Sequence, residues 1–198
     1  SFNCHINPGD RIALSGPTGC GKSTVAKIIA GLLIAWDGDV LYDSQLRNNL
    51  SKETFHHSVS FIETKPVFFE DTIRNNLTLW DQSIPESDII RAAKDAHVHD
   101  IISSRPDGYD GLISENGKNF SGGQLQRLEI ARALSTNPTI LILDEAFSSL
   151  EKELALDIDH NIRKRGITTI IISNQMDLIK DCNEIIVMND GLISDRGT

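Results

Sequence analysis

A glycine-rich loop near the N-terminus carries the residues best suited to chemistry. It follows the pattern G-x-x-x-x-G-K-[ST] and consists of Gly16, Pro17, Thr18, Gly19, Cys20, Gly21, Lys22, Ser23 and Thr24. Its glycines let backbone N–H groups approach an anion, and the start of a following helix adds positive charge. Lys22 can reach outer phosphates, and the Ser23 hydroxyl suits a Mg²⁺ ion. The loop predicts a nucleotide site, since an ordinary Gly-rich turn would match by chance about once in a hundred.

Two carboxylates, Asp144 and Glu145, follow the apolar run of residues 140–143. The carboxyl end of a parallel strand is where open α/β sheets bind ligands. Asp144 could hold Mg²⁺, and Glu145 could orient or deprotonate a water that attacks the γ-phosphate. An acidic N-cap for the next helix is the alternative. Beside the glycine-rich loop we favour the catalytic interpretation.

The elements that must position these residues alternate between short β-rich runs and helical patterns, which predicts an α/β fold with a largely parallel sheet. We expect strands at 12–15, 40–42, 59–62, 139–143, 167–172 and 184–188, and helices at 22–33, 122–135 and 151–165. Helical segments at 72–77, 86–96 and 100–103, with no strand candidate between them, predict a helical subdomain of about 71–135. We expect residues 1–198 to form one P-loop NTPase domain with a partial antiparallel β subdomain.

Composition excludes several classes of function. The chain has 19 Lys and Arg against 28 Asp and Glu, a net charge of -9, which argues against nucleic-acid binding. The basic cluster at 163–165 suits the end of a helix. No apolar run approaches the roughly 18 residues of a membrane span, and no signal-peptide pattern is present, so we expect a soluble domain. Cys4, Cys20 and Cys182 are odd in number and far apart, as in a reducing cytosol.

A family resemblance rests on several motifs in order along the chain. Residues 120–127, Phe-Ser-Gly-Gly-Gln-Leu-Gln-Arg, resemble the signature motif of ATP-binding cassette (ABC) ATPases, and their distance from Asp144 is similar too. Residues 66–69 and 71–74 resemble the segment after the Q-loop, and 148–151 the D-loop. The resemblance covers essentially the whole chain. It implies ATP as the nucleotide, Mg²⁺ as the cofactor and hydrolysis coupled to transport.

The signature segment has its own physical basis. Ser121 can cap a helix that begins at Gly122, and Gly122 and Gly123 let amides approach an anion. A plain N-capped helix is the alternative. The resemblance implies instead that Ser121, Gly122, Gly123 and Gln124 act in trans. They would close on the γ-phosphate held by a second ABC ATPase domain, arranged head to tail, in a homodimer or heterodimer.

Finer similarities concern the type of transporter. Residues 115–117 resemble the corresponding segment of the exporter subgroup. In that subgroup the cassette is fused to a transmembrane domain and lies at the cytoplasmic face of the cell membrane. A narrower similarity is to the cassettes of bacteriocin or lanthipeptide exporters, and it rests on Tyr109 and on residues 127–134 and 181–186. Phe68 and Phe69 could line the groove for a coupling helix or pack in the core. The resemblance also implies truncation at both ends, which would leave out the aromatic residue that stacks on adenine.

Two residues depart from the family pattern. Thr64 stands at the Q-loop Gln position and lacks an amide carbonyl for the metal, although a register slip could let Glu63 substitute. Asn174 stands at the switch His position and cannot carry a positive charge. Glu151 replaces the D-loop Asp, a milder change. We therefore expect the half-site built on this glycine-rich loop to bind Mg-ATP well and to hydrolyse it slowly. The alternative is a hydrolysis-impaired ATP-binding module that dimerises and regulates a competent partner half-site. A third possibility, a small-molecule P-loop kinase, is disfavoured because the sequence shows no feature that would bind a phosphate acceptor.

Overall fold

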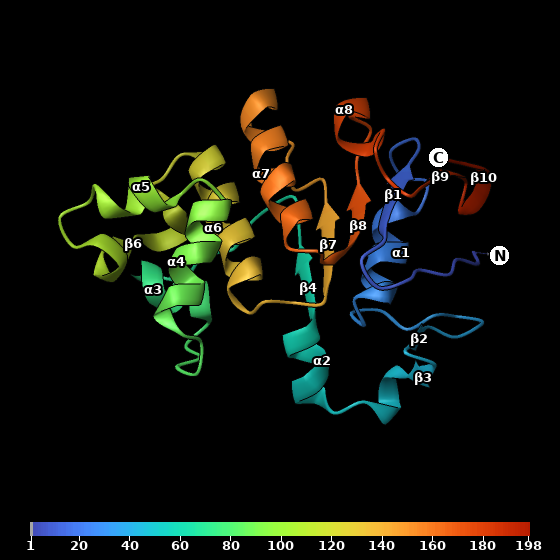
Figure 1. The fold of residues 1–198 in the computed structure, drawn as a ribbon, viewed down its shortest axis with the longest axis horizontal. Helices are drawn as coiled ribbons and strands as arrows, with labels where there is room; N and C mark the ends of the chain where they lie inside the picture. The colour runs from blue at the N-terminus through green and yellow to red at the C-terminus, as the bar shows by residue number, and fades with distance from the viewer. Residues whose placement is uncertain (1) are drawn as a thin grey trace. The chain divides into compact units, whose positions relative to one another are not determined.

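The computed structural model describes residues 2–198, and it divides into two compact units. The first unit comprises the chain up to Phe61 with Pro138–Glu145 and Gly166–Thr198. The second comprises Ile62–Asn137 and Ala146–Arg165. Figure 1 labels the elements of both units. Among residues 2–198, no helix combines the length and the apolar character that crossing a bilayer would require.

The first unit contains a six-stranded sheet in the order β10-β9-β1-β8-β7-β4. β1 pairs in parallel with β8 and β9, β7 pairs in parallel with β8, and β10 is antiparallel to β9. The predicted α/β fold with a mostly parallel sheet is confirmed. The strands are β1 (Arg11–Ser15), β4 (Val59–Ile62), β7 (Ile140–Asp144), β8 (Thr168–Ile172), β9 (Glu184–Asn189) and β10 (Leu192–Gly197).

The register of the parallel strands brings three carboxyl ends level with one another. Ile172 at the end of β8 lies opposite Leu14 of β1 and opposite Asp144 of β7. β8 therefore stands between the loop that leaves β1 and the carboxylates that end β7 (Figure 1). Ligands of open α/β sheets bind at this edge.

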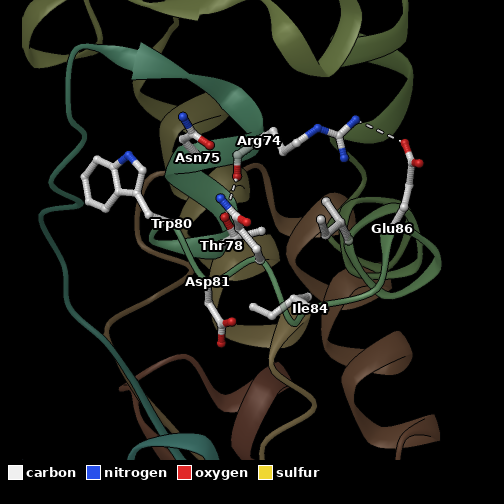
Figure 2. Close-up of a pocket in the computed structure, with 9 residues that line it drawn as sticks. Arg74, Asn75, Thr78, Trp80, Asp81, Ile84 and Glu86 are labelled. Carbon is white, nitrogen blue, oxygen red and sulfur yellow. Dashed lines mark hydrogen bonds and ion pairs between the residues drawn. The ribbon is translucent and has the colours of Figure 1, made fainter.

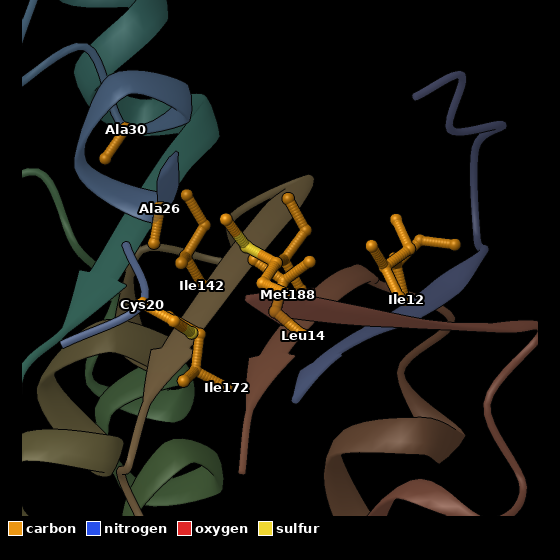
Figure 3. Packing of buried hydrophobic residues seen from close by; sticks show 10 residues of the cluster. Ile12, Leu14, Cys20, Ala26, Ala30, Ile142, Ile172 and Met188 are labelled. Atoms are coloured by element: carbon orange, nitrogen blue, oxygen red, sulfur yellow. The ribbon is translucent and has the colours of Figure 1, made fainter. Parts of the chain in front are cut away.

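The core of the first unit is built from branched side chains of the strands and small side chains of helix α1 (Lys22–Ile29). Figure 3 shows Ala26 of α1 and the nearby Ala30 beside Ile142 of β7. Ala26 is fully buried, and its single methyl group lets the helix approach the sheet closely. The cluster contains Ile12, Leu14, Cys20, Ala26, Ala30, Ile142, Ile170, Ile172, Ile186 and Met188.

Helix α1 ends at Ile29, four residues before the predicted end. Gly31 adopts a positive φ of 70° and terminates the helical path. Tyr42 donates a hydrogen bond from its hydroxyl to the Ile29 carbonyl, which satisfies one exposed helix acceptor. Leu32, which lies within the predicted helix, is therefore outside the observed helix and is 60% exposed.

The smaller elements of the first unit were only partly foreseen. β2 (Leu41–Tyr42) confirms the predicted strand and pairs with β3 (Gln45–Leu46), while Asp190 and Gly191 at positive φ form the turn before β10. β3, β10, α2 and α8 were not predicted, because they are short or, in β10, largely exposed without apolar alternation. The remaining elements are η1 (Arg47–Asn49), α2 (Lys52–Ser58) and α8 (Met176–Ile179).

The second unit is mainly helical. Helix α6 (Gly122–Ser135) has the predicted bounds and packs against α3 and α4. No strand interrupts the helical segments between residues 73 and 103, as expected, but two short strands that were not predicted flank them, since β5 (Asp71–Thr72) pairs antiparallel with β6 (Leu112–Ile113). Two-residue strands are too short to show alternation. The other elements are α3 (Ile73–Thr78), α4 (Glu86–Asp95), α5 (His99–Ser103), α7 (Lys152–Lys164), η2 (Gly108–Asp110) and η3 (Glu115–Gly117).

Arg132 of α6 holds the segment that enters the second unit. Its Nε donates to the Asn76 carbonyl at 2.7 Å, and Nη1 donates to the Val67 carbonyl at 2.9 Å. The guanidinium also lies 4.4 Å from the centre of the Phe68 ring and pairs with Glu129 at 2.7 Å. Burial raises the pKa of Glu129, an effect that the nearby Arg132 opposes. The ion pair within α6 is therefore largely buried, and Arg132 links Val67 and Phe68 to this helix.

We expect Arg132→Met to lower the free energy of unfolding by about 3–5 kcal/mol, because it leaves the Glu129 carboxylate buried without its cation. Denaturant titration measures this change. Lys118→Met is the matched control, since Lys118 is 72% exposed and its pair with Glu115 spans 3.8 Å, so its loss costs at most about 1 kcal/mol. Equal midpoints for the two variants would contradict the assignment.

The loop between β1 and α1 packs closely on β9. A Cβ at Gly16 would lie 2.2 Å from the Met188 carbonyl oxygen, and Gly16 has a φ of 138°. Gly19 also has a positive φ, 81°, but a Cβ there would meet nothing within 4 Å. Gly16 is therefore required for packing as well as for backbone conformation.

Gly16→Ala should destabilise the first unit by roughly 3 kcal/mol or more, because about 1–3 kcal/mol of overpacking adds to the backbone strain. Gly19→Ala should cost only the strain, about 1–2 kcal/mol. Thermal unfolding without nucleotide compares the two. A smaller loss for Gly16→Ala than for Gly19→Ala would show that the contact with β9 is unimportant.

Candidate functional site

The glycine-rich loop lies in the first unit and combines exposed backbone with the ammonium group of Lys22. Pro17, Thr18 and Gly19 are exposed, whereas Lys22 at the start of α1 is only 7% exposed. Lys22 Nζ donates to the Gly16 carbonyl at 2.7 Å and to the Pro17 carbonyl at 2.9 Å. These neutral acceptors fix the ammonium beside the loop without cancelling its charge. The arrangement is suited to an anion.

The two carboxylates lie at the same edge of the sheet as this loop. Asp144 is the last residue of β7 and is 6% exposed. Glu145 has a positive φ of 54°, and its N–H donates to the Ile172 carbonyl at 3.1 Å. That hydrogen bond extends the pairing with β8 by one residue and turns the chain sharply. A non-glycine residue held at positive φ next to a ligand edge is typical of functional sites.

Asn174 makes direct contact with the glycine-rich loop. It follows β8, and its side-chain oxygen Oδ1 accepts a hydrogen bond from the Ser15 hydroxyl at 2.9 Å and another from the Gly16 N–H at 3.2 Å. The structure thus brings together residues that are about 160 positions apart in the sequence. Ser15 was not singled out from the sequence, although a hydroxyl at the end of the apolar run Ile12-Ala13-Leu14 was a recognisable signal.

The signature residues lie in the second unit. Ser121 Oγ accepts from the Gln124 N–H at 3.3 Å, and Gln124 Oε1 accepts from the Ser121 N–H at 2.9 Å. This reciprocal capping box satisfies two free N–H groups at the start of α6. The predicted N-cap is confirmed, and the role of the motif in trans stays a prediction. Thr64 also belongs to the second unit, where it is exposed.

The two phenylalanines after the Q-loop position have different environments. Phe68 is buried beneath Arg132, so of the two alternatives, a groove lining or core packing, this residue belongs to the core. Phe69 is 46% exposed and lies 5.1 Å from the Trp80 ring centre. Nearby is a pocket of about 340 Å³ that the sequence did not predict. Figure 2 shows Trp80 and the ion pair of Arg74 with Glu86 at its wall.

Tyr109, one of the residues behind the narrower exporter similarity, has a structural role in the second unit. Its hydroxyl lies 2.9 Å from His99 Nδ1. Burial raises the pKa of Tyr109 to about 12. The contact joins α5 to η2.

Comparisons with known proteins agree with one another. The ABC transporter family model matches residues 1–148. The multidrug transporter MDR5 of Trichophyton rubrum is 35% identical over 200 residues, covering 100% of this chain and 16% of its own length. The ATP-dependent lipid A-core flippase of Syntrophus aciditrophicus is 35% identical over 199 residues, covering 100% of this chain and 33% of its own length.

Solved structures show the same relationship. A bacterial Atm1-family ABC exporter with ATP bound superposes with a TM-score of 0.89 at 33% identity, over 98% of this chain and 34% of that one. The chain therefore spans between about a sixth and a third of the length of these relatives. Sequence and structure together establish that this chain belongs to the ABC transporter family.

Proposed function

We propose that this chain is the nucleotide-binding domain of an ABC exporter and that it hydrolyses ATP to drive export across a membrane. The observation that carries the proposal is the edge of the sheet where the glycine-rich loop, Asp144, Glu145 and Asn174 meet. Its relatives include a multidrug transporter and an ATP-dependent flippase, which supports the proposal.

The phosphates would bind to residues 16–24. Thr18 and Gly19 are exposed, and α1 begins at Lys22, where the first N–H groups of a helix have no intrahelical partner. The Lys22 ammonium can exchange its two carbonyl acceptors for phosphate oxygens. A phosphate oxygen carries charge, so this exchange gives a stronger, charge-assisted hydrogen bond.

Mg²⁺ fits the donor set of this site. Ser23 supplies a hydroxyl and Asp144 a carboxylate, both oxygen ligands of the kind that Mg²⁺ prefers. Within residues 2–198 no group of three or more His, Cys, Asp or Glu is placed to hold a metal ion. An ion here would therefore rely on few protein ligands together with phosphate oxygens and water, as is usual for Mg²⁺. When bound, the ion neutralises charge on the phosphates.

Glu145 would orient the attacking water, and Asn174 would donate a hydrogen bond to the terminal phosphate. Glu145 has a positive φ, whereas Asp144 is the last residue of β7, and we assign the metal to Asp144 and the water to Glu145. Thr64 would occupy the Q-loop position with a shorter side chain than the usual Gln. We infer weakened turnover from Thr64 and Asn174.

The proposed partners are a second ABC ATPase domain and a transmembrane domain. Ser121, Gly122, Gly123 and Gln124 would act on the nucleotide of the second domain, which is arranged head to tail and is identical or different. The greater length of the relatives leaves room for a membrane-embedded part. The domain would then work at the cytoplasmic face of the membrane and bind no nucleic acid. A bacteriocin or lanthipeptide cargo stays a prediction that these relatives' names do not support.

Glu145→Gln should keep Mg-dependent ATP binding and slow phosphate release by about 10²-fold or more, the usual contribution of a general base. The measurement is phosphate release at saturating Mg-ATP by the full-length protein that carries this chain. Lys22→Ala is the control, since it should weaken binding itself. Equal release by the parent and Glu145→Gln would favour the hydrolysis-impaired regulatory module instead.

Asn174→His should raise the single-turnover rate of hydrolysis by about 10-fold or more, because an imidazole can carry positive charge as negative charge develops on the phosphate. Asn174→Ala serves as the comparison and should be slower than the parent. An unchanged rate for Asn174→His would remove the claim that Asn174 limits turnover.

A further inference from the structure

Ser15 and Asn174 form a hydrogen-bonded pair at the base of the glycine-rich loop. The chain leaving β8 continues alongside β1, because the Ser173 N–H donates to the Leu14 carbonyl at 3.3 Å. The next residue, Asn174, thereby comes opposite Ser15 and Gly16. Its Oδ1 accepts from both, at 2.9 Å and 3.2 Å. All of these groups lie in the first unit.

The chemistry of the partners fixes which way the Asn174 amide faces. A backbone N–H can only donate, so the side-chain atom that meets Gly16 must be the acceptor Oδ1. A flipped amide would place two donors against each other. The Ser15 hydroxyl then donates to the same oxygen, and the two hydrogen bonds occupy both of its lone pairs.

This orientation leaves the Asn174 amide nitrogen for another partner. Nδ2 carries two N–H groups on the side of the amide opposite to Oδ1. Among the hydrogen bonds of residues 2–198, Asn174 takes part only through Oδ1. Asn174 is exposed, and it directly follows Ser173 beyond the carboxyl end of β8.

We propose that Ser15 is a positioning residue whose hydroxyl holds the Asn174 amide so that Nδ2 donates to the terminal phosphate of ATP. This inference rests on the proposed function. The terminal torsion of an asparagine side chain has a broad energy profile, so it needs contacts to define it. Without the Ser15 hydroxyl, the longer contact with Gly16 remains as the contact holding the amide, and water competes for Oδ1.

The effects of substituting Ser15 and Asn174 should not be additive. If Ser15 acts through Asn174, its hydroxyl has no role once the amide is gone. Residues that share one hydrogen-bond network show such coupling, whereas independent residues add. A double-mutant cycle therefore separates positioning from a general effect on the loop.

The test uses the full-length protein with Ser15→Ala, Asn174→Ala and the double variant, and measures the Kd for Mg-ATP and the single-turnover rate of hydrolysis. Ser15→Ala should lower the rate about 3- to 10-fold, the value of one hydrogen bond, with the Kd changed less than about 2-fold. Asn174→Ala should lower the rate by about 10²-fold. In the Asn174→Ala background, Ser15→Ala should have no further effect.

Conservative variants of Ser15 provide the second part of the experiment. Ser15→Thr keeps the hydroxyl and should retain the parent rate, whereas Ser15→Cys, with its weak S–H donor, should behave like Ser15→Ala and replaces it if that variant does not fold. An equal loss from Ser15→Ala in both backgrounds, or a parent-like rate for Ser15→Ala, would overturn the inference while leaving ATP binding intact. Failure of the parent itself to bind Mg-ATP would overturn the proposed function and this inference with it.

Discussion

The constraint on which the site depends is the parallel pairing of β1, β8 and β7. Parallel strands in register end at one edge, and here that edge receives a cation with free backbone donors from β1, an amide from the end of β8 and two carboxylates from β7. Fixed at one edge of the sheet, these groups can act together on one ligand.

The two units use different means to hold their functional segments. In the first unit, the glycine-rich loop is held by packing, because Gly16 has no Cβ to strike the β9 carbonyl. In the second unit, the segment after Thr64 is held by a buried guanidinium that binds two carbonyl groups and an aromatic ring. Added side-chain volume destabilises the packed loop, whereas loss of a partner destabilises the buried charge.

Much of this arrangement was predictable from the sequence because its physical causes are local. The G-x-x-x-x-G-K-[ST] loop, the wholly apolar strands and the capping residue Ser121 each show in a few adjacent residues. The two-residue pairing of β5 with β6 and the exposed strand β10 leave no such pattern. Contacts of Ser15 with Asn174 and of Arg132 with Val67 depend on how distant segments meet, which spacing alone does not reveal.

The hydrogen bonds of Lys22 have a consequence for the order in which the site assembles as the chain folds. They join residues five and six positions apart, so little chain entropy is lost in closing them. Asn174 reaches Ser15 across 159 positions and must await the pairing of β1 with β8. We therefore expect the hydrogen bonds of Lys22 within the loop to form early in folding, and the contact of Asn174 with Ser15 to form among the last.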